Sequence, residues 1–174
     1  MARLTIGASV APRSLESIRG IRLSIPHPVL LTHLQFRRFA GCPTCNLHLQ
    51  SFVRRHDELS SRGIQEVAVF HSTRTAMLRH HAQVSFALIA DPAQSLYRQF
   101  GATRSILSLL DPRAWPAFMV GLLRHGVELP SRGESLLGLP ADFLIDQAGR
   151  IVALKYGSHA YDQWEVDDVL ALAV

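Results

Sequence analysis

The sequence holds two cysteines, a single lysine and no long hydrophobic run, and each scarcity excludes a class of protein. Two cysteines in 174 residues are too few for the disulfide framework of a small secreted protein. No stretch approaches the ~18–20 consecutive apolar residues that a transmembrane helix needs, so we expect no membrane partner. Lys155 is the only lysine, and the arginines are scattered rather than gathered with aromatic residues, so we expect no nucleic-acid partner.

Two further motifs are missing. The sequence has no Gly-rich dinucleotide fingerprint, so we expect no flavin or nicotinamide cofactor. The N-terminal segment carries small residues from position 8 to 11, as a signal peptide would, but its apolar part is short and is broken by Gly7. We therefore expect a cytoplasmic protein, and in that compartment an isolated cysteine pair indicates redox or metal chemistry.

Length and composition predict one globular domain over residues 1–174. Hydrophobic residues make up 48% of the chain, which disfavours disorder and suffices for a substantial core. The charged fraction of 18% is low for a free surface and leaves room for a buried or oligomeric face. No internal repeat or linker-like stretch divides the chain.

Strand and helix patterns alternate along the chain. Strand-like segments, rich in β-branched, aromatic and leucine residues, occupy residues 29–40, 64–71, 86–91, 143–145 and 151–155. Helical patterns occupy residues 46–62, 73–81, 92–100, 106–125 and 166–173. Residues 146–150 join the last two strands as a hairpin. This order predicts an α/β sandwich with a mixed sheet.

The two cysteines form a Cys42-Pro43-Thr44-Cys45 motif at the junction of a predicted strand and a predicted helix. Pro43 suits the first position of a helix, because its φ is already helical and its missing N–H has no partner to lose there. Cys42 is then the predicted N-cap, and Cys45 lies in the first turn. Both sulfurs would sit beside unpaired N–H groups at the positive end of the helix dipole, which stabilises the reactive thiolate. The spacing also lets the two sulfurs close into a disulfide.

A metal site is an alternative interpretation of the same motif. Cys42, Cys45 and His48 form a C-x2-C-x2-H pattern, and His48 lies about one helical turn after Cys45. Structural zinc needs a tetrahedral set of nitrogen and sulfur ligands, usually from two pairs. The remaining ligand would have to come from His71, His80 or His81, because no second paired motif exists. We predict no metal and keep a CxxC/His metal-binding or regulatory module as an alternative.

Three segments of the chain carry a resemblance to a known family. They are LQFRRFAGCPTCNLHL at 34–49, VAVFHSTRTAMLRHH…FALIADPAQSLYRQFGA within 67–102, and LPADFLIDQAGRIVALKYG at 139–157. In this order they resemble the peroxiredoxin-like branch of the alkyl hydroperoxide reductase/thiol-specific antioxidant (AhpC/TSA) family. The resemblance implies a thioredoxin-like fold of the peroxiredoxin type, an α/β/α sandwich with a mixed central sheet.

The resemblance assigns roles to the cysteines in two ways. On the peroxiredoxin Thr-x-x-Cys pattern, Cys45 attacks the peroxide and Cys42 replaces the threonine that helps orient it. Arg38 then stands where the family has a proline, and the family's late arginine falls near Pro140. On the thioredoxin pattern, Cys42 attacks and Cys45 resolves, and Leu139-Pro140 matches the cis-proline that faces the pair. The motif is intermediate between the two patterns.

Charged residues near the motif are further candidates. Arg37 and Arg38 precede it and alternate to opposite faces of the strand, so either one could approach the sulfurs. Asp142 follows Pro140 and is expected to be an exposed carboxylate at a strand end, with a position facing the site as the alternative. Asp146 is expected to be a turn residue.

These observations predict a peroxiredoxin-like antioxidant thiol oxidoreductase. Cys45 attacks a peroxide and becomes a sulfenic acid, Cys42 condenses with it to a disulfide, and an external thioredoxin- or glutaredoxin-like thiol restores the dithiol. The expected supporting residues are Arg38, Pro43, Thr44 and Pro140. A disulfide reductase or isomerase with Cys42 attacking is the alternative enzyme.

Relatives of this kind often pair, so the resemblance also allows a homodimer. The helical segment 106–125 carries an apolar face that we expect to pack in the core, with a dimer contact or a cover over the active site as alternatives. Its members are Trp115, Phe118, Met119, Leu122 and Leu123.

Overall fold

The computed structural model describes residues 3–102, 116, 119–120, 123, 134–135 and 138–173. A five-stranded sheet in the order β5-β4-β3-β6-β7 lies at its centre, and β1 pairs with β2 in a separate small sheet. The strands are β1 (Arg13–Glu16), β2 (Arg22–Ile25), β3 (Leu31–Arg37), β4 (Ile64–Phe70), β5 (Ala87–Ala90), β6 (Ala141–Ile145) and β7 (Ile151–Tyr156). The helices are α1 (Pro43–Arg54), α2 (His56–Ser61), α3 (Arg74–His81), α4 (Ser95–Phe100) and α6 (Val166–Leu172).

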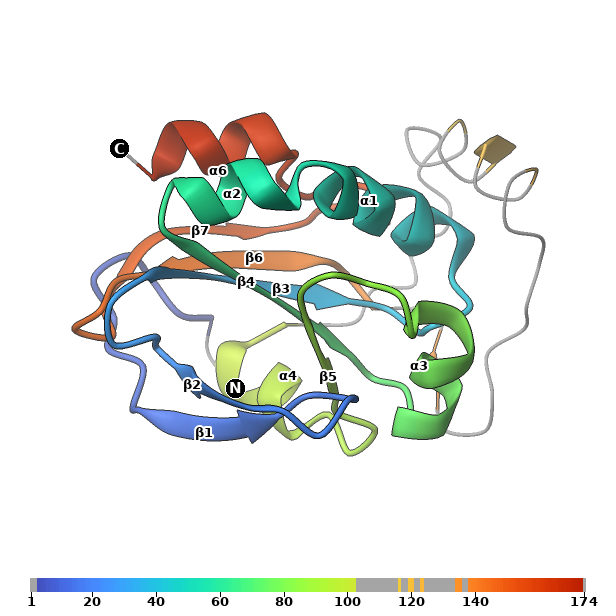
Figure 1. Ribbon diagram of the computed structural model, residues 1–174, viewed down its shortest axis with the longest axis horizontal. Helices are drawn as coiled ribbons and strands as arrows, with labels where there is room; N and C mark the ends of the chain where they lie inside the picture. The colour runs from blue at the N-terminus through green and yellow to red at the C-terminus, as the bar shows by residue number, and fades with distance from the viewer. Residues whose placement is uncertain are drawn as a thin grey trace.

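The central sheet lies between two layers (Figure 1). Helices α1, α2 and α6 cover one face, and α4 with the β1–β2 hairpin covers the other. An apolar core lies between the sheet and each layer. The core under α1 and α6 is built around Leu49, Phe52 and Val169, and the core on the α4 side is built around Phe36, Phe100 and Phe143. This arrangement confirms the predicted α/β sandwich with a mixed central sheet.

The strand directions place the cysteine motif at one edge of the sheet. Strands β3, β4 and β5 run parallel, whereas β6 is antiparallel to both β3 and β7. Arg37 is in register with Phe70, so the carboxyl ends of β3 and β4 meet at the same edge. Helix α1 begins a few residues beyond that end of β3, and its first residue is Pro43.

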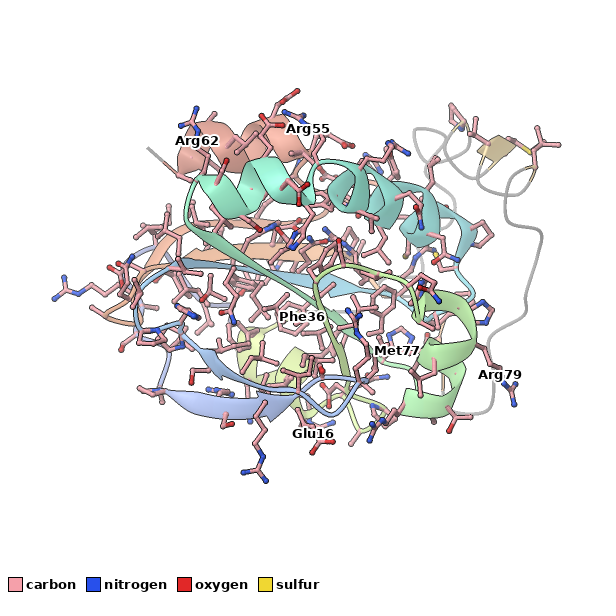
Figure 2. All side chains as sticks on the ribbon, viewed as in Figure 1. Glu16, Phe36, Arg55, Arg62, Met77 and Arg79 are labelled. Atoms are coloured by element: carbon pink, nitrogen blue, oxygen red, sulfur yellow. The ribbon has the colours of Figure 1, made fainter. Side chains whose placement is uncertain are left out.

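The two faces of β3 differ in polarity. Leu34 and Phe36 belong to the apolar core on the α4 side. Figure 2 shows Phe36 inside the molecule, while the side chains of Arg62 and Arg79 point outward. Three polar residues of β3 alternate with these apolar ones and are also fully buried: His33, Gln35 and Arg37. A polar row therefore lies inside the protein on the face that α1 covers.

Most of the predicted elements are confirmed, with shifted ends. The helix after the cysteine motif begins at Pro43, as predicted, but the helical pattern over 46–62 is divided at Arg55 into α1 and α2. The predicted helix over 92–100 begins only at Ser95, because both carboxylate oxygens of Asp91 accept N–H groups of its first turn. Gly63 ends α2 with a φ of 72°, a backbone conformation that glycine adopts without strain.

The segment over 106–125 lies almost entirely outside the described residues. Of its predicted apolar face, Met119 and Leu123 are described, and they are 51% and 82% exposed. The expectation that these two side chains pack in the core is therefore wrong. Among the described residues, no helix has the length and apolar character needed to cross a membrane.

Candidate active site

Cys42 caps the N-terminus of α1, as the sequence predicts. Its backbone is extended, with φ −69° and ψ 114°, and its sulfur accepts the N–H of Cys45 at 3.3 Å. Pro43 occupies the first helical turn. Both cysteines are free thiols, and they expose only 1% and 4% of their surface. The motif thus places two close sulfurs at the positive end of a helix dipole, where a thiolate is stabilised.

The two thiols have opposite acidities. Burial alone would raise the pKa of Cys45, but the hydrogen bond from the Cys42 thiol and the charge of Arg38 lower the pKa to about 5. Burial raises the pKa of Cys42 well above its ordinary value, and the hydrogen bond to Cys45 and the charge on Cys45 raise it further. The pair therefore holds one proton near neutral pH, on Cys42, and one thiolate, on Cys45.

Arg38 is the cation at the sulfurs. Burial would lower its pKa, but the charges of Cys42 and Cys45, with hydrogen bonding to both sulfurs, raise the pKa further above the ordinary range. The segment before β6 confines the stem of this side chain, since a Cβ built on Gly138 would lie 3.2 Å from Cγ of Arg38. Of the two arginines that the sequence left open, Arg38 is the one at the sulfurs.

Backbone contacts fix the loop that leads into the motif. The N–H of Ala40 donates to the Ser72 hydroxyl at 2.8 Å, and Nε2 of His81 donates to the Ala40 carbonyl at 3.1 Å. The N–H of Cys42 donates to the Phe39 carbonyl at 3.1 Å. These bonds hold the first sulfur in place before α1 begins.

The other two predicted supporting residues differ in how they lie. Thr44 is buried in the first turn of α1. Pro140 precedes β6, and its carbonyl accepts the N–H of Gly157 at 2.9 Å. The prediction of a cis Leu139-Pro140 bond is wrong, because the cis peptide of the described chain is Ile25-Pro26. The trans isomer is the default for an X–Pro bond, and only the match to the thioredoxin pattern had suggested otherwise.

Asp142 is not the exposed carboxylate that the sequence suggested. It is fully buried on β6, and its Oδ1 accepts Nη2 of Arg37 at 2.9 Å. Its Oδ2 accepts the backbone N–H of Trp164 at 3.2 Å. Asp142 lies directly opposite Gln35 in the antiparallel pairing of β3 and β6. Its side chain therefore points to the same face of the sheet and joins the buried polar row of β3.

The polar row continues to β4. Nδ1 of His33 lies 2.9 Å from a carboxylate oxygen of Glu66, and its Nε2 lies 3.5 Å from Oδ1 of Asp142. Gln35 donates to Glu66 and accepts from Arg37. Glu66, His33, Asp142 and Arg37 form a buried cluster that can hold two anions and two cations. Sequence reasoning missed it, because alternating polar residues in a strand are typical of a solvent-facing surface.

The cluster fixes the protonation of its members. Burial would lower the pKa of His33, but the charges and hydrogen bonds of Glu66 and Asp142 raise the pKa to about 9. Burial would raise the pKa of Asp142, but Arg37 and His33 hold it well below its ordinary range. His33 is therefore a cation and Asp142 an anion near neutral pH.

His48 does not join the cysteines as a ligand. Its Nε2 donates to the carbonyl of Trp164 at 2.8 Å. Among the residues that the structure describes, no group of three or more histidine, cysteine or acidic side chains is arranged to hold a metal ion. Of the other histidines considered as ligands, His81 contacts the Ala40 carbonyl, and His71 accepts the N–H of Ser135 at 3.0 Å.

Comparison with known proteins adds a family and a fold. The family profile described as AhpC/TSA antioxidant enzyme matches residues 51–159, more than half of the chain. The match begins after Cys45, so the cysteine motif lies outside it. No curated protein sequence matches the chain.

Solved structures share the whole architecture at low sequence identity. The peroxidoxin BcpB of Mycobacterium tuberculosis superposes with a TM-score of 0.72 at 16% identity, covering 98% of this chain and 97% of that one. A PrxQ mutant of Xylella fastidiosa gives 0.69 at 13%, covering 99% and 95%. A protein of Chlorobium tepidum assigned as the thiol:disulfide interchange protein DsbE gives 0.63 at 17%, covering 98% and 99%. The predicted thioredoxin-like fold of the peroxiredoxin type is confirmed.

Proposed function

The chain belongs to the AhpC/TSA antioxidant enzyme family and is a thiol-dependent oxidoreductase, and we propose that it reduces peroxides with the pair Cys45 and Cys42. The Cys45 thiolate attacks one oxygen of the peroxide, and the O–O bond breaks. Cys45 becomes a sulfenic acid, and the other oxygen leaves with a proton as an alcohol or water. The Cys42 sulfur then attacks the sulfenic sulfur, water leaves, and a Cys42–Cys45 disulfide forms.

The observation that carries this proposal is the contact of Arg38 with both sulfurs at the start of α1. A guanidinium and a helix N-terminus together favour the thiolate of Cys45 over its thiol. The same donors face the negative charge that grows on the peroxide as the O–O bond breaks. Cys42 retains its proton in this state, so it does not compete for the peroxide. When it attacks the sulfenic acid, that proton leaves with the sulfenic hydroxyl as water.

The burial of both sulfurs favours a small substrate. A protein disulfide must bring a sulfur in line with the attacking thiolate, and Cys42 and Cys45 expose 1% and 4% of their surface. A hydroperoxide needs space for only one oxygen at the thiolate. We therefore rank peroxide above disulfide as the electrophile.

A disulfide reductase remains the second candidate, and one observation favours it. Cys42 occupies the N-cap and its sulfur accepts the N–H of Cys45, the position that suits an attacking sulfur in the thioredoxin pattern. In that reaction the Cys42 thiolate attacks a substrate disulfide, and Cys45 then displaces the reduced substrate.

The reaction needs an external reductant. Two thiols of a donor reduce the Cys42–Cys45 disulfide by exchange and become a disulfide themselves. We propose a thioredoxin- or glutaredoxin-like dithiol protein in this role, and a homodimer as the assembled state. The single domain over residues 1–174 and the cytoplasmic location stay part of this proposal.

Intact mass after alkylation tests the function directly. The reduced parent, its Cys42→Ser form and its Cys45→Ser form are each mixed with one equivalent of hydrogen peroxide and quenched over seconds. We expect rapid loss of both alkylatable thiols in the parent, and a trappable sulfenic acid only in the Cys42→Ser form. Oxidation no faster than that of a free thiol, together with rapid reduction of a small disulfide, would establish the reductase instead.

The same samples test the metal-binding alternative. Metal content is measured in the protein as purified and after reduction. A stoichiometric ion that is lost on replacing either Cys42 or His48 would favour the binding module over the enzyme site.

A further inference from the structure

A series of hydrogen bonds joins His48 on α1 to Arg37 on β3. Its Nε2 donates to the carbonyl of Trp164 at 2.8 Å, and the N–H of Trp164 donates to Oδ2 of Asp142 at 3.2 Å. Oδ1 of Asp142 accepts Nη2 of Arg37 at 2.9 Å. Arg37 is followed in the chain by Arg38, which contacts Cys45. The contacts run from α1 through the segment before α6 to β6 and β3, and return to α1 at the sulfurs.

The position of His48 on α1 couples it to Cys45. The two residues are three apart, about one helical turn, so they lie on the same face of the helix. His48 is fully buried, and its ring packs against Phe52 at 4.9 Å and Tyr161 at 6.1 Å between centroids. A rotation or shift of α1 that moved His48 would therefore also move the Cys45 sulfur.

The bond to Trp164 is made by a neutral imidazole. Burial and the charge of Arg37 hold the pKa of His48 well below its ordinary value. The charged groups around it are Arg37, His33 and Asp142 from the sheet, and the carboxylate of Glu165 at 3.9 Å from Nε2. Since Nε2 carries the proton, Nδ1 does not, and Nδ1 has no hydrogen-bond partner among the described residues. His48 is thus a fixed donor rather than a group that exchanges protons with the thiols.

Two anchors hold the start of α1. The first is the loop before the helix, where Ala40 is held by Ser72 and His81. The second is His48, one turn beyond Cys45, and it ties the helix to the segment before α6. The packing of Leu49 and Phe52 in the core also holds α1. The His48 bond adds the polar contact that opposes a small turn of the helix, which would draw the Cys45 sulfur away from Arg38, the residue after β3.

We propose that His48 is a positioning residue for Cys45: through the Trp164 carbonyl it sets the rotation of α1, and with it the contact between the Cys45 sulfur and Arg38. This inference rests on the proposed thiolate role of Cys45 and deepens it. His48 touches neither the peroxide nor the sulfur that reacts with it. It acts by placing the helix that carries Cys45.

Three substitutions separate the hydrogen bond from the bulk of the side chain. His48→Gln carries an N–H donor at about the place of Nε2, His48→Met keeps similar bulk without a donor, and His48→Asn keeps an amide that is too short to reach Trp164. The readout is the pH dependence of alkylation at Cys45 in the reduced dithiol protein, followed by peptide mass spectrometry. His56→Met is the matched control, because His56 lies on α2 and does not contact Trp164.

We expect His48→Gln to have the same alkylation midpoint as the parent, that is, the pH at which Cys45 reacts at half its maximal rate. His48→Met and His48→Asn should raise this midpoint. A midpoint that is one pH unit higher lowers the rate of alkylation about tenfold, when the rates are compared at a pH below both midpoints. Unchanged midpoints in the Met and Asn variants, with only a lower melting temperature, would overturn the positioning role. His48→Asn also serves as the test if His48→Met does not fold.

This measurement uses no peroxide, so it separates the two proposals. A low midpoint that rises in the Met and Asn variants supports the positioning role even if the parent fails to reduce peroxides. A parent midpoint equal to that of a free thiol would overturn both.

Discussion

Oδ1 of Asp142 on β6 and Nη2 of Arg37 on β3 lie 2.9 Å apart, and neither side chain reaches solvent. This pairing commits Arg37 to the sheet and leaves its neighbour Arg38 as the cation at the sulfurs. It also places an anion between two buried cations, since His33 lies on the other side of Asp142 at 3.5 Å. The electrostatics of the thiol site therefore begin in the buried polar row of the sheet.

Asp142→Asn is expected to destabilise the fold strongly. It removes one of two buried anions and leaves Arg37 and His33 with Glu66 alone, and breaking such a pair costs about 3–5 kcal/mol. Denaturant unfolding measures the loss. The matched control is Asp146→Asn in the exposed hairpin turn, where one hydrogen bond from the N–H of Arg150 is at stake and about 1 kcal/mol or less should be lost. Equal losses at the two positions would contradict the cluster's role.

Arg38→Gln is expected to raise the pKa of Cys45, because it removes the charge that favours the thiolate. The alkylation midpoint of Cys45 should move up by at least about one unit, which slows the reaction of Cys45 about tenfold at a pH below both midpoints and about twofold near pH 6. Arg38→Lys keeps the positive charge but lacks the planar guanidinium group, so it should recover part of the rate of reaction with peroxide. Arg79→Gln, at an arginine that points outward (Figure 2), is the control and should leave both quantities unchanged.

The parent protein should show two separate thiol titrations. Alkylation at Cys45 should rise as pH increases through about 5 and then level off, because the lowered pKa keeps the thiolate populated from there upward. Cys42 should react only well above its ordinary range, since its pKa is raised. Peptide mapping after short exposures to iodoacetamide at a series of pH values assigns each midpoint. A lower midpoint at Cys42 than at Cys45 would reverse the assignment of the attacking sulfur.

Alkaline pH should destabilise the protein through His33. Its folded-state pKa of about 9 exceeds the ordinary 6.5, so the folded protein binds the proton more tightly than the unfolded chain does. That stabilisation is complete below pH 6.5 and is lost as the pH rises through about 9. The free energy of unfolding, measured by urea titration between pH 6 and 10, should fall more steeply in the parent than in His33→Gln. Parallel curves for the two proteins would show that His33 is not held as a cation.

The sequence alone determined the parts of this protein that depend on neighbours in the chain. The cap at Cys42, the first-turn proline and the start of α1 follow from four consecutive residues, because helix initiation is a local event. The hairpin of β6 and β7 and the helix stop at Gly63 are local in the same sense. Three ordered resemblances were enough to predict the thioredoxin-like sandwich, which the solved structures confirm.

The roles of the polar residues depend on partners that are distant in the sequence. Nothing local distinguishes Arg37 from Arg38, and β6 selects between them by placing Asp142 beside the first. His33, Gln35 and Arg37 alternate as residues on a solvent-facing strand would, yet they are buried because their partners come from strands distant in sequence. Buried polar groups need partners, and those partners are brought together only when β4 and β6 pair with β3 on either side. The cysteine chemistry is thus encoded in a short motif, while the charges that tune it are assembled by the sheet.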